Sequence, residues 1–134
     1  MFGPAGVAYV YLIYGVHHCL NFVTEQDSRA GAVLVRALEP VDGREAMIRR
    51  RGLEVGCRER DVAAGPGKLC SACGIDLGWN GLPLVRPTGR KRVLWLERPG
   101  GESPRVVATP RIGIRRAADR PYRFTDAGSN CLSR

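Results

Sequence analysis

The first 24 residues of this 134-residue chain lack Asp, Glu, Lys and Arg. A secretory signal begins with a basic region, and no basic residue precedes Val7. The longest apolar run, residues 7–14, has eight residues, whereas a membrane-spanning helix needs about 20. We therefore expect no secretory signal, no membrane span and no membrane partner. The expected location is intracellular, in the cytoplasm or nucleoid if the source is bacterial.

The chain also lacks the cysteine pattern of a disulfide scaffold, because it has five cysteines, an odd number, at irregular spacing. Cys70 and Cys73, spaced as C-x-x-C, look like half of a zinc site, but a second pair at this spacing is missing. The remaining candidate ligands are scattered: Cys57, Cys131, His17, His18 and Cys19. Residues 67–74 read as a short helix, and buried free cysteine is common. We favour core packing and expect no metal.

Positive charge is in excess and is concentrated in one region. The chain has 21 Lys and Arg against 13 Asp and Glu, which gives a net charge of +8. Residues 86–123 hold 11 of the basic residues and 3 of the acidic ones. This balance favours a phosphate-rich partner such as nucleic acid over a protein that is simply basic. The length fits one domain with a single core.

The pattern of apolar residues and turn signals predicts mainly short strands. The expected strands are 9–14, 16–24, 32–38, 93–97, 106–114 and 122–125, with Gly15 as a bend or bulge. Asp42 is expected to cap a helix over residues 43–51, with Glu45 in the capping-box position. A basic loop, the short helix over 67–74 and a turn at WNGL follow. We predict an α+β fold with antiparallel pairing and a sheet that curves toward a barrel.

Two basic side chains stand in unusual positions. Arg36 lies in an apolar strand, where an arginine is rare unless it is paired. It is either bridged to a carboxylate such as Glu39 or faces a pocket that holds an anion, a phosphate or a water. Lys68, in GPGKLC, stands at the start of a helix and could contribute to a phosphate seat. The motif is weak because the full P-loop spacing is absent.

Three tyrosines surround the expected bend. Tyr9 and Tyr11 point to one face of a strand, and Tyr14, just before Gly15, can point elsewhere. Aromatic faces beside a basic groove suit the stacking of bases. The alternative is that these tyrosines fill the core.

Five segments together resemble the alkyladenine (3-methyladenine) DNA glycosylases of the mammalian type. They are MFGPAGVAYVYLIYGVHHCLNFV, AVLVRALEP, GPGKLC, PRIGI and PYRF, and they occur in the family's order over nearly the whole chain. The resemblance implies a single domain with a curved antiparallel sheet, which excises alkylated purines without a metal or other cofactor. It further implies a monomer that binds double-stranded DNA carrying alkylated or deaminated purines.

The resemblance also assigns roles to the tyrosines and to Asn21. Tyr14 would intercalate where a nucleotide has been flipped out, because filling the gap offsets part of the cost of unstacking. Tyr11 would stack on the extruded base, and Tyr9 would line the same pocket. Asn21 would test the purine edge and exclude the amino group of normal guanine.

Three further roles follow from the same resemblance. Arg36 and the backbone carbonyl of Ile112 would hold the attacking water. Lys68 would contact a phosphate.

The family's water-activating glutamate, in an ETEAY motif, lies upstream of the position of Met1, which corresponds to an internal methionine of the family's MFGP motif. The ETEAY motif is absent from this chain. Glu25 and Asp27 fall in a polar loop and Glu39 precedes a proline, so we expect none of them to act as the general base. We therefore expect residues 1–134 to be a partial glycosylase domain without its N-terminal segment, without a catalytic residue of its own and inactive by itself. The alternative is a non-catalytic nucleic-acid-binding domain.

Overall fold

The computed structural model describes residues 1–26, 28–86, 94–97, 100–101 and 103–133. An antiparallel sheet of order β1-β2-β3 contains β1 (Ala8–Ile13), β2 (His17–Val23) and β3 (Ala32–Leu34). A second antiparallel sheet pairs β4 (Val106–Thr109) with β5 (Arg123–Asp126). The helices are α1 (Arg44–Arg51), α2 (Glu59–Ala63), α3 (Pro66–Cys73) and the 3-10 turn η1 (Leu77–Trp79). The α+β class with antiparallel pairing is confirmed, and the strands are divided between two sheets.

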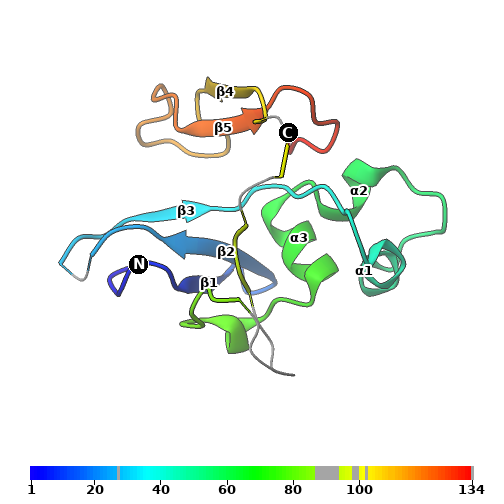
Figure 1. The fold of residues 1–134 in the computed structure, drawn as a ribbon, viewed down its shortest axis with the longest axis horizontal. Coiled ribbons are helices and arrows are strands. Elements are labelled where there is room, and N and C mark those ends of the chain that lie inside the picture. Colours follow the sequence, from blue (N-terminus) through cyan, green and yellow to red (C-terminus); the bar gives the residue numbers. More distant parts are fainter. Residues whose placement is uncertain (27, 87–93, 98–99, 102, 134) are drawn as a thin grey trace.

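The hydrophobic core lies between the helices and one face of the first sheet. Helices α1, α2 and α3 gather at one end of that sheet, and the β4–β5 pair forms a separate layer beside β3 (Figure 1). The buried core residues are Ala8, Val10, Leu20, Ile48, Val62, Ala63, Leu69, Cys70, Ala72 and Ile75. Successive side chains of a strand point to opposite faces. Because Ala8 and Val10 face the core, Tyr9 and Tyr11 face away from it.

The helical predictions are correct for two of the three α-helices. Helices α1 and α3 form within one residue of their predicted bounds, but the expected cap of α1 is wrong. The N-cap is Gly43, with a φ of 67°, and no side chain caps the helix. Asp42 Oδ1 instead accepts a hydrogen bond of 2.7 Å from the adjacent Gly43 N. Helix α2 forms where a basic loop was predicted. The prediction was wrong because the helix begins with polar residues and has only two buried ones, Val62 and Ala63.

Strands β3 and β4 end several residues earlier than predicted. β3 stops at Leu34 because the chain turns toward α2, where Leu38 N donates to Ala63 O at 3.2 Å. β4 stops at Thr109 because Pro110 has no N–H to donate.

Two further predictions concern the segment before β4. One of these is the expected strand 93–97, of which Val93 lies outside the described residues. Leu94 makes one isolated β-bridge with Leu84, and residues 95–97 form no strand. The turn at WNGL is confirmed, because Leu82 N donates to Trp79 O at 3.2 Å. Among the helices of the described residues, none has the length and apolar character needed to cross a bilayer.

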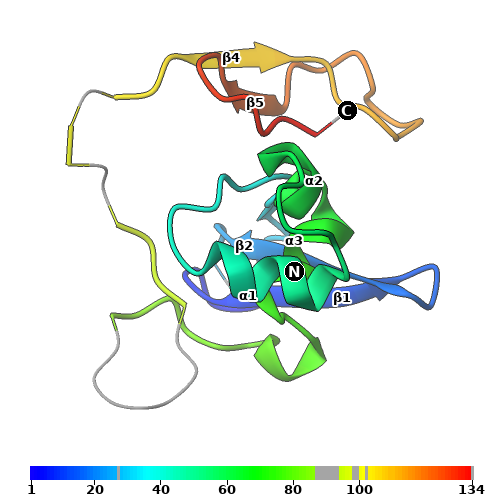
Figure 2. The ribbon, with the colours of Figure 1, turned by 90° about the vertical axis from the view of Figure 1, so that its right-hand side faces the viewer.

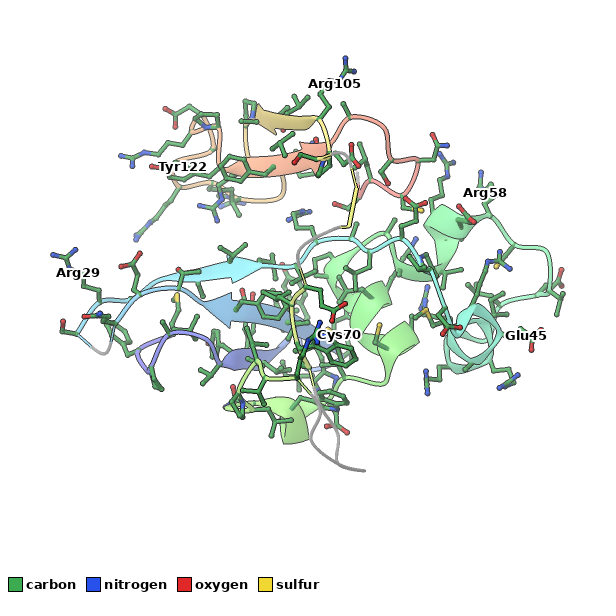
Figure 3. All side chains as sticks on the ribbon, in the orientation of Figure 1. Arg29, Glu45, Arg58, Cys70, Arg105 and Tyr122 are labelled. Atoms are coloured by element: carbon green, nitrogen blue, oxygen red, sulfur yellow. The ribbon has the colours of Figure 1, made fainter. Side chains whose placement is uncertain are left out.

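The two cysteines of the C-x-x-C pair are packing residues. Cys70 is 1% exposed and lies between α3 and the first sheet (Figure 3). Cys73 is partly buried and packs against the same core. Burial raises the pKa of the Cys70 thiol to about 11. The neutral thiol is therefore the form that the folded protein favours.

Cys70 makes stability depend on alkaline pH. An unfolded thiol titrates near 9.0, so the stabilisation is complete below that pH and is lost as pH rises toward about 11. With allowance for solvent screening, we expect a loss of at most about 2 kcal/mol. Urea unfolding between pH 8 and about pH 11 should show a flatter decline of the free energy of unfolding for Cys70→Ala than for the wild type. Equal slopes for the two proteins would contradict this account.

Candidate nucleic-acid interface

The register of the β1–β2 pair places Tyr9 opposite Asn21 and Tyr11 opposite Cys19. Directly opposed residues of an antiparallel pair share one face, so these four side chains lie together away from the core. The rings of Tyr9 and Tyr11 are 5.5 Å apart between centroids and tilted by 32°. Burial, followed by the Cys19 thiol, raises the pKa of the Tyr11 hydroxyl. Tyr11 therefore presents a neutral ring.

A cavity of about 640 Å³ lies between this face and the second sheet. Tyr11, Arg36 and Ile112 all line it. They come from β1, from the segment after β3 and from the loop between β4 and β5. Three residues predicted to serve one site are thus brought to one cavity.

Arg36 does not form the salt bridge with Glu39 that was considered as an alternative. Its Nε donates to Ser133 Oγ at 3.2 Å, and Glu39 Oε2 accepts instead from Ser129 Oγ at 3.1 Å. Burial, then the charges of Arg123 and Arg111, lower the pKa of Arg36. Its guanidinium is therefore held by a neutral acceptor at the wall of the cavity.

Tyr14 lies at the tip of the β1–β2 hairpin and is 86% exposed. Tyr14 and Gly15 have φ values of 54° and 71°, and Val16 N donates to Ile13 O at 3.2 Å. Positive φ at both central residues is typical of a type I′ turn, which here forms part of the connection 14–16. The turn and the β4–β5 loop project on the same side of the molecule in Figure 2. Tyr14 is therefore not a core residue.

Asn21 is 6% exposed and is held by the backbone of its own sheet. Its Nδ2 donates to Tyr9 O at 3.2 Å and to Cys19 O at 3.4 Å. The side chain therefore lies beside the two tyrosines of the same sheet face. It is not among the described side chains that line the cavity, and its role at a purine edge stays a prediction.

Lys68 lies in a different hollow. A second cavity, of about 620 Å³, is lined by Lys68 together with His17, His18 and Arg51. A Cβ added to Gly67 would come within 3.1 Å of His17 Cγ, so this glycine allows β2 to approach the start of α3 closely. Lys68 is exposed in the first turn of α3, which suits a contact with a phosphate but separates it from Tyr11 and Arg36.

Arg111, Arg123 and Ser133 also line the first cavity, and no role for them was predicted from the sequence. Arg123 Nη1 donates to Thr109 Oγ1 at 3.2 Å, and Nη2 donates to Ser133 O at 2.7 Å. Arg111 and Arg123 stand in the PRIGI and PYRF segments, which were used only for the resemblance. A search for basic residues within those segments would have identified both arginines.

Carboxylates also line the first cavity, namely Glu39 and Asp126. Glu39 reaches the cavity because the segment after β3 returns beside the C-terminal residues, and the expectation that it does not act as the general base stays a prediction. Glu25 is exposed in the loop between β2 and β3, and Asp27 lies outside the described residues. In the part of the chain that the structure describes, no three His, Cys, Asp or Glu side chains gather closely enough to hold a metal ion.

Met1 is not itself a residue of the candidate site. It is 50% exposed, and among the described residues it lines neither of the two cavities. The segment that follows it is tied to the first sheet, since Gly6 N donates to Val23 O at 2.9 Å. The family's water-activating glutamate was expected upstream of Met1, where this chain has no residue. That position of the general base therefore stays a prediction.

Comparison with known proteins identifies the family. The family model of methylpurine-DNA glycosylase (MPG) matches residues 1–130. Proteins named "Putative 3-methyladenine DNA glycosylase" from Nitrobacter winogradskyi and Rhodopseudomonas palustris strain HaA2 are each 50% identical, over 100% and 99% of this chain and 60% and 62% of their own lengths. A protein of the same name from Methanoculleus marisnigri is 46% identical over 100% of this chain and 68% of its own length. The chain thus spans about 60% of the first two relatives, and it belongs to the methylpurine-DNA glycosylase family.

Proposed function

We propose that the protein to which these residues belong is a base-excision-repair DNA glycosylase. It flips alkylated purines of the 3-methyladenine type out of the duplex and hydrolyses the N-glycosidic bond. The observation that carries the proposal is that Tyr11, Arg36 and Ile112, which are remote in sequence, line one cavity. Membership of the methylpurine-DNA glycosylase family supports the same reaction.

The hairpin tip supplies the means of opening the duplex. Tyr14 is exposed on a turn whose backbone is set by Gly15 and by the Val16–Ile13 hydrogen bond. An aromatic ring that enters the base stack offsets part of the few kcal/mol of unstacking. Lys68 and the other basic residues of the second cavity contact the phosphates of the duplex.

The face of the first sheet receives the flipped base. Tyr11 stacks on it, and Tyr9, 5.5 Å away between ring centroids, extends the aromatic surface. A cationic alkylated purine is attracted to such an electron-rich ring face. Asn21 is held by hydrogen bonds from its Nδ2 to the backbone oxygens of Tyr9 and Cys19. Its side-chain amide is placed near the purine edge and excludes the amino group of normal guanine.

The attacking water lies between Arg36 and the Ile112 carbonyl in this proposal. Arg36 can orient the water but cannot take its proton, because a guanidinium stays charged. The two carboxylates that line the cavity already accept hydrogen bonds. Glu39 accepts one from the Ser129 hydroxyl, and Asp126 Oδ1 accepts one of 2.9 Å from Gly128 N.

The general base is the part of the machinery that these residues do not supply. We propose that residues 1–134 are part of a glycosylase domain. The resemblance puts its water-activating carboxylate upstream of the position of Met1, and the chain spans about 60% of the length of the first two relatives.

A second candidate is a domain that binds nucleic acid without catalysis. It is favoured by the hydrogen bonds that already hold Glu39 and Asp126. In either case the proposed partner is double-stranded DNA with alkylated or deaminated purines. The proposed protein is a monomer that needs no cofactor and works in the cytoplasm or nucleoid.

Duplex binding should depend on salt, because each neutralised phosphate releases a counterion. Lys68→Ala should weaken binding of damaged and undamaged duplex alike and lower the slope of log affinity against log salt by about one. Fluorescence anisotropy between about 50 and 200 mM salt measures this, with Lys68→Arg as the control that keeps the charge. If affinity did not change with salt, the second cavity would not be a phosphate-binding surface. If Lys68→Ala weakened binding of damaged DNA alone, Lys68 would instead belong to the base pocket.

Tyr14→Gly should separate the role of the ring from its contribution to stability. Glycine adopts positive φ freely and little packing is lost at an exposed site, so the free energy of unfolding should stay equal or rise by about 1 kcal/mol. Flipping should lose roughly 1–3 kcal/mol of stacking, seen as a smaller fluorescence gain of 2-aminopurine beside the lesion. Tyr14→Phe should behave as the wild type. A Tyr14→Gly protein that unfolds, or that flips normally, would rule out the wedge.

The 134-residue chain by itself should excise little or no base. A positioned general base typically contributes about 10²–10⁴-fold, and small misplacement of the base is also costly. Release of hypoxanthine or 3-methyladenine from duplex DNA should be measured beside the Nitrobacter winogradskyi relative. Comparable turnover by the short chain would refute this expectation, and Glu39→Gln and Asp126→Asn would then show which carboxylate acts.

A further inference from the structure

Arg36, Arg111 and Arg123 all line the first cavity. None of them is in an ion pair within the described residues, where the two salt bridges are Arg58–Asp61 and Arg86–Glu97. Guanidinium groups gathered in a partly buried site normally have anionic partners. No described carboxylate therefore forms an ion pair with this cluster, although Glu39 and Asp126 line the same cavity.

The hydrogen bonds that hold the cluster use neutral acceptors. Arg36 Nε donates to the Ser133 hydroxyl, and Arg123 donates to the Thr109 hydroxyl and the Ser133 carbonyl. Arg123 Nε is buried without a hydrogen-bond partner. Within the described residues no hydrogen bond uses Arg111 or the terminal nitrogens of Arg36. Several guanidinium donors thus remain for a ligand.

The arginines repel one another. After burial, the charges of Arg123 and then Arg111 are the largest causes of the lowered pKa of Arg36, and each guanidinium stays charged at any working pH. The two carboxylates that line the cavity accept hydrogen bonds from neutral donors, Glu39 from Ser129 and Asp126 from Gly128, and neither contacts an arginine of the cluster within ion-pair distance. An anion that entered the cavity would relieve this repulsion and satisfy the free donors.

We propose that Arg36, Arg111 and Arg123 form an oxyanion seat that binds a phosphodiester of the extruded nucleotide. The inference rests on the proposed function, and it extends that function to two arginines and to a backbone phosphate held inside the base cavity. A nucleotide whose base stacks on Tyr11 carries its flanking phosphates toward the same walls. Guanidinium groups match phosphate oxygens with paired, charge-assisted hydrogen bonds.

The test is a double-mutant cycle on a duplex with one tetrahydrofuran abasic-site analogue. Each flanking phosphodiester is replaced in turn by an uncharged methylphosphonate. For the wild type, one of the two replacements should weaken binding by about 10–100-fold, the range for hydrogen bonds to a charged group. Arg111→Gln should weaken binding to the charged duplex similarly and be almost insensitive to that replacement. Arg115→Gln, on the same loop but outside the cavity lining, should keep the wild-type sensitivity.

An independent arm uses inorganic phosphate alone, at an ionic strength matched with sodium chloride. Phosphate should raise the Tm of the wild type and of Arg111→Lys, and not that of Arg111→Gln. Arg111 is exposed, so Arg111→Gln should fold, as circular dichroism will show. Equal sensitivity of wild type and Arg111→Gln to methylphosphonate, or an equal Tm shift in phosphate, would overturn the seat. Absence of duplex binding with an Arg111-dependent Tm shift would overturn the proposed function and the phosphodiester as occupant, and it would leave a site for a free anion.

Discussion

The tight turn at Tyr14 and Gly15 fixes which side chains reach the cavity. Both residues have positive φ, and this short connection sets the register of β1 against β2. A slip of one residue would move every side chain of a strand to the opposite face. Tyr9 and Tyr11 would then enter the core, and Ala8 and Val10 would face the cavity. The aromatic surface and the apolar core thus depend on the same backbone constraint.

Two arginines held by neutral acceptors, Arg36 after β3 and Arg123 in β5, connect the two sheets at the site. The Ser133 hydroxyl accepts a hydrogen bond from Arg36, and the Ser133 carbonyl accepts one from Arg123. One residue near the end of the described chain therefore connects the two sheets. Neutral acceptors orient a guanidinium without cancelling its charge. The same contacts therefore hold the fold together and keep the cavity electropositive, which suits a polyanionic partner.

Local patterns in the sequence predicted the features that are local in space. The strands on either side of Gly15 and helix α3, which begins within the GPGK segment, follow from alternation, turn chemistry and spacing. The resemblance placed Arg36 and Ile112 in one site. The role of Ser133 could not be read from the sequence, because its hydroxyl accepts from Arg36, which is 97 positions away. Helix α2 was not predicted because it begins with three charged residues and buries only Val62 and Ala63. Asp42 does not cap α1 because its carboxylate accepts a hydrogen bond from the adjacent Gly43 N.

The contact between Arg36 and Ser133 joins residues 97 positions apart, and this separation has a kinetic consequence. Closing a longer loop costs more chain entropy, and folding slows as contacts become less local. A β-hairpin forms in about 1–10 μs. We infer that β1 and β2 pair early and that the cavity closes last, when the C-terminal residues reach Arg36. A nascent or partly unfolded chain would then display its aromatic turn before it has a complete pocket behind it.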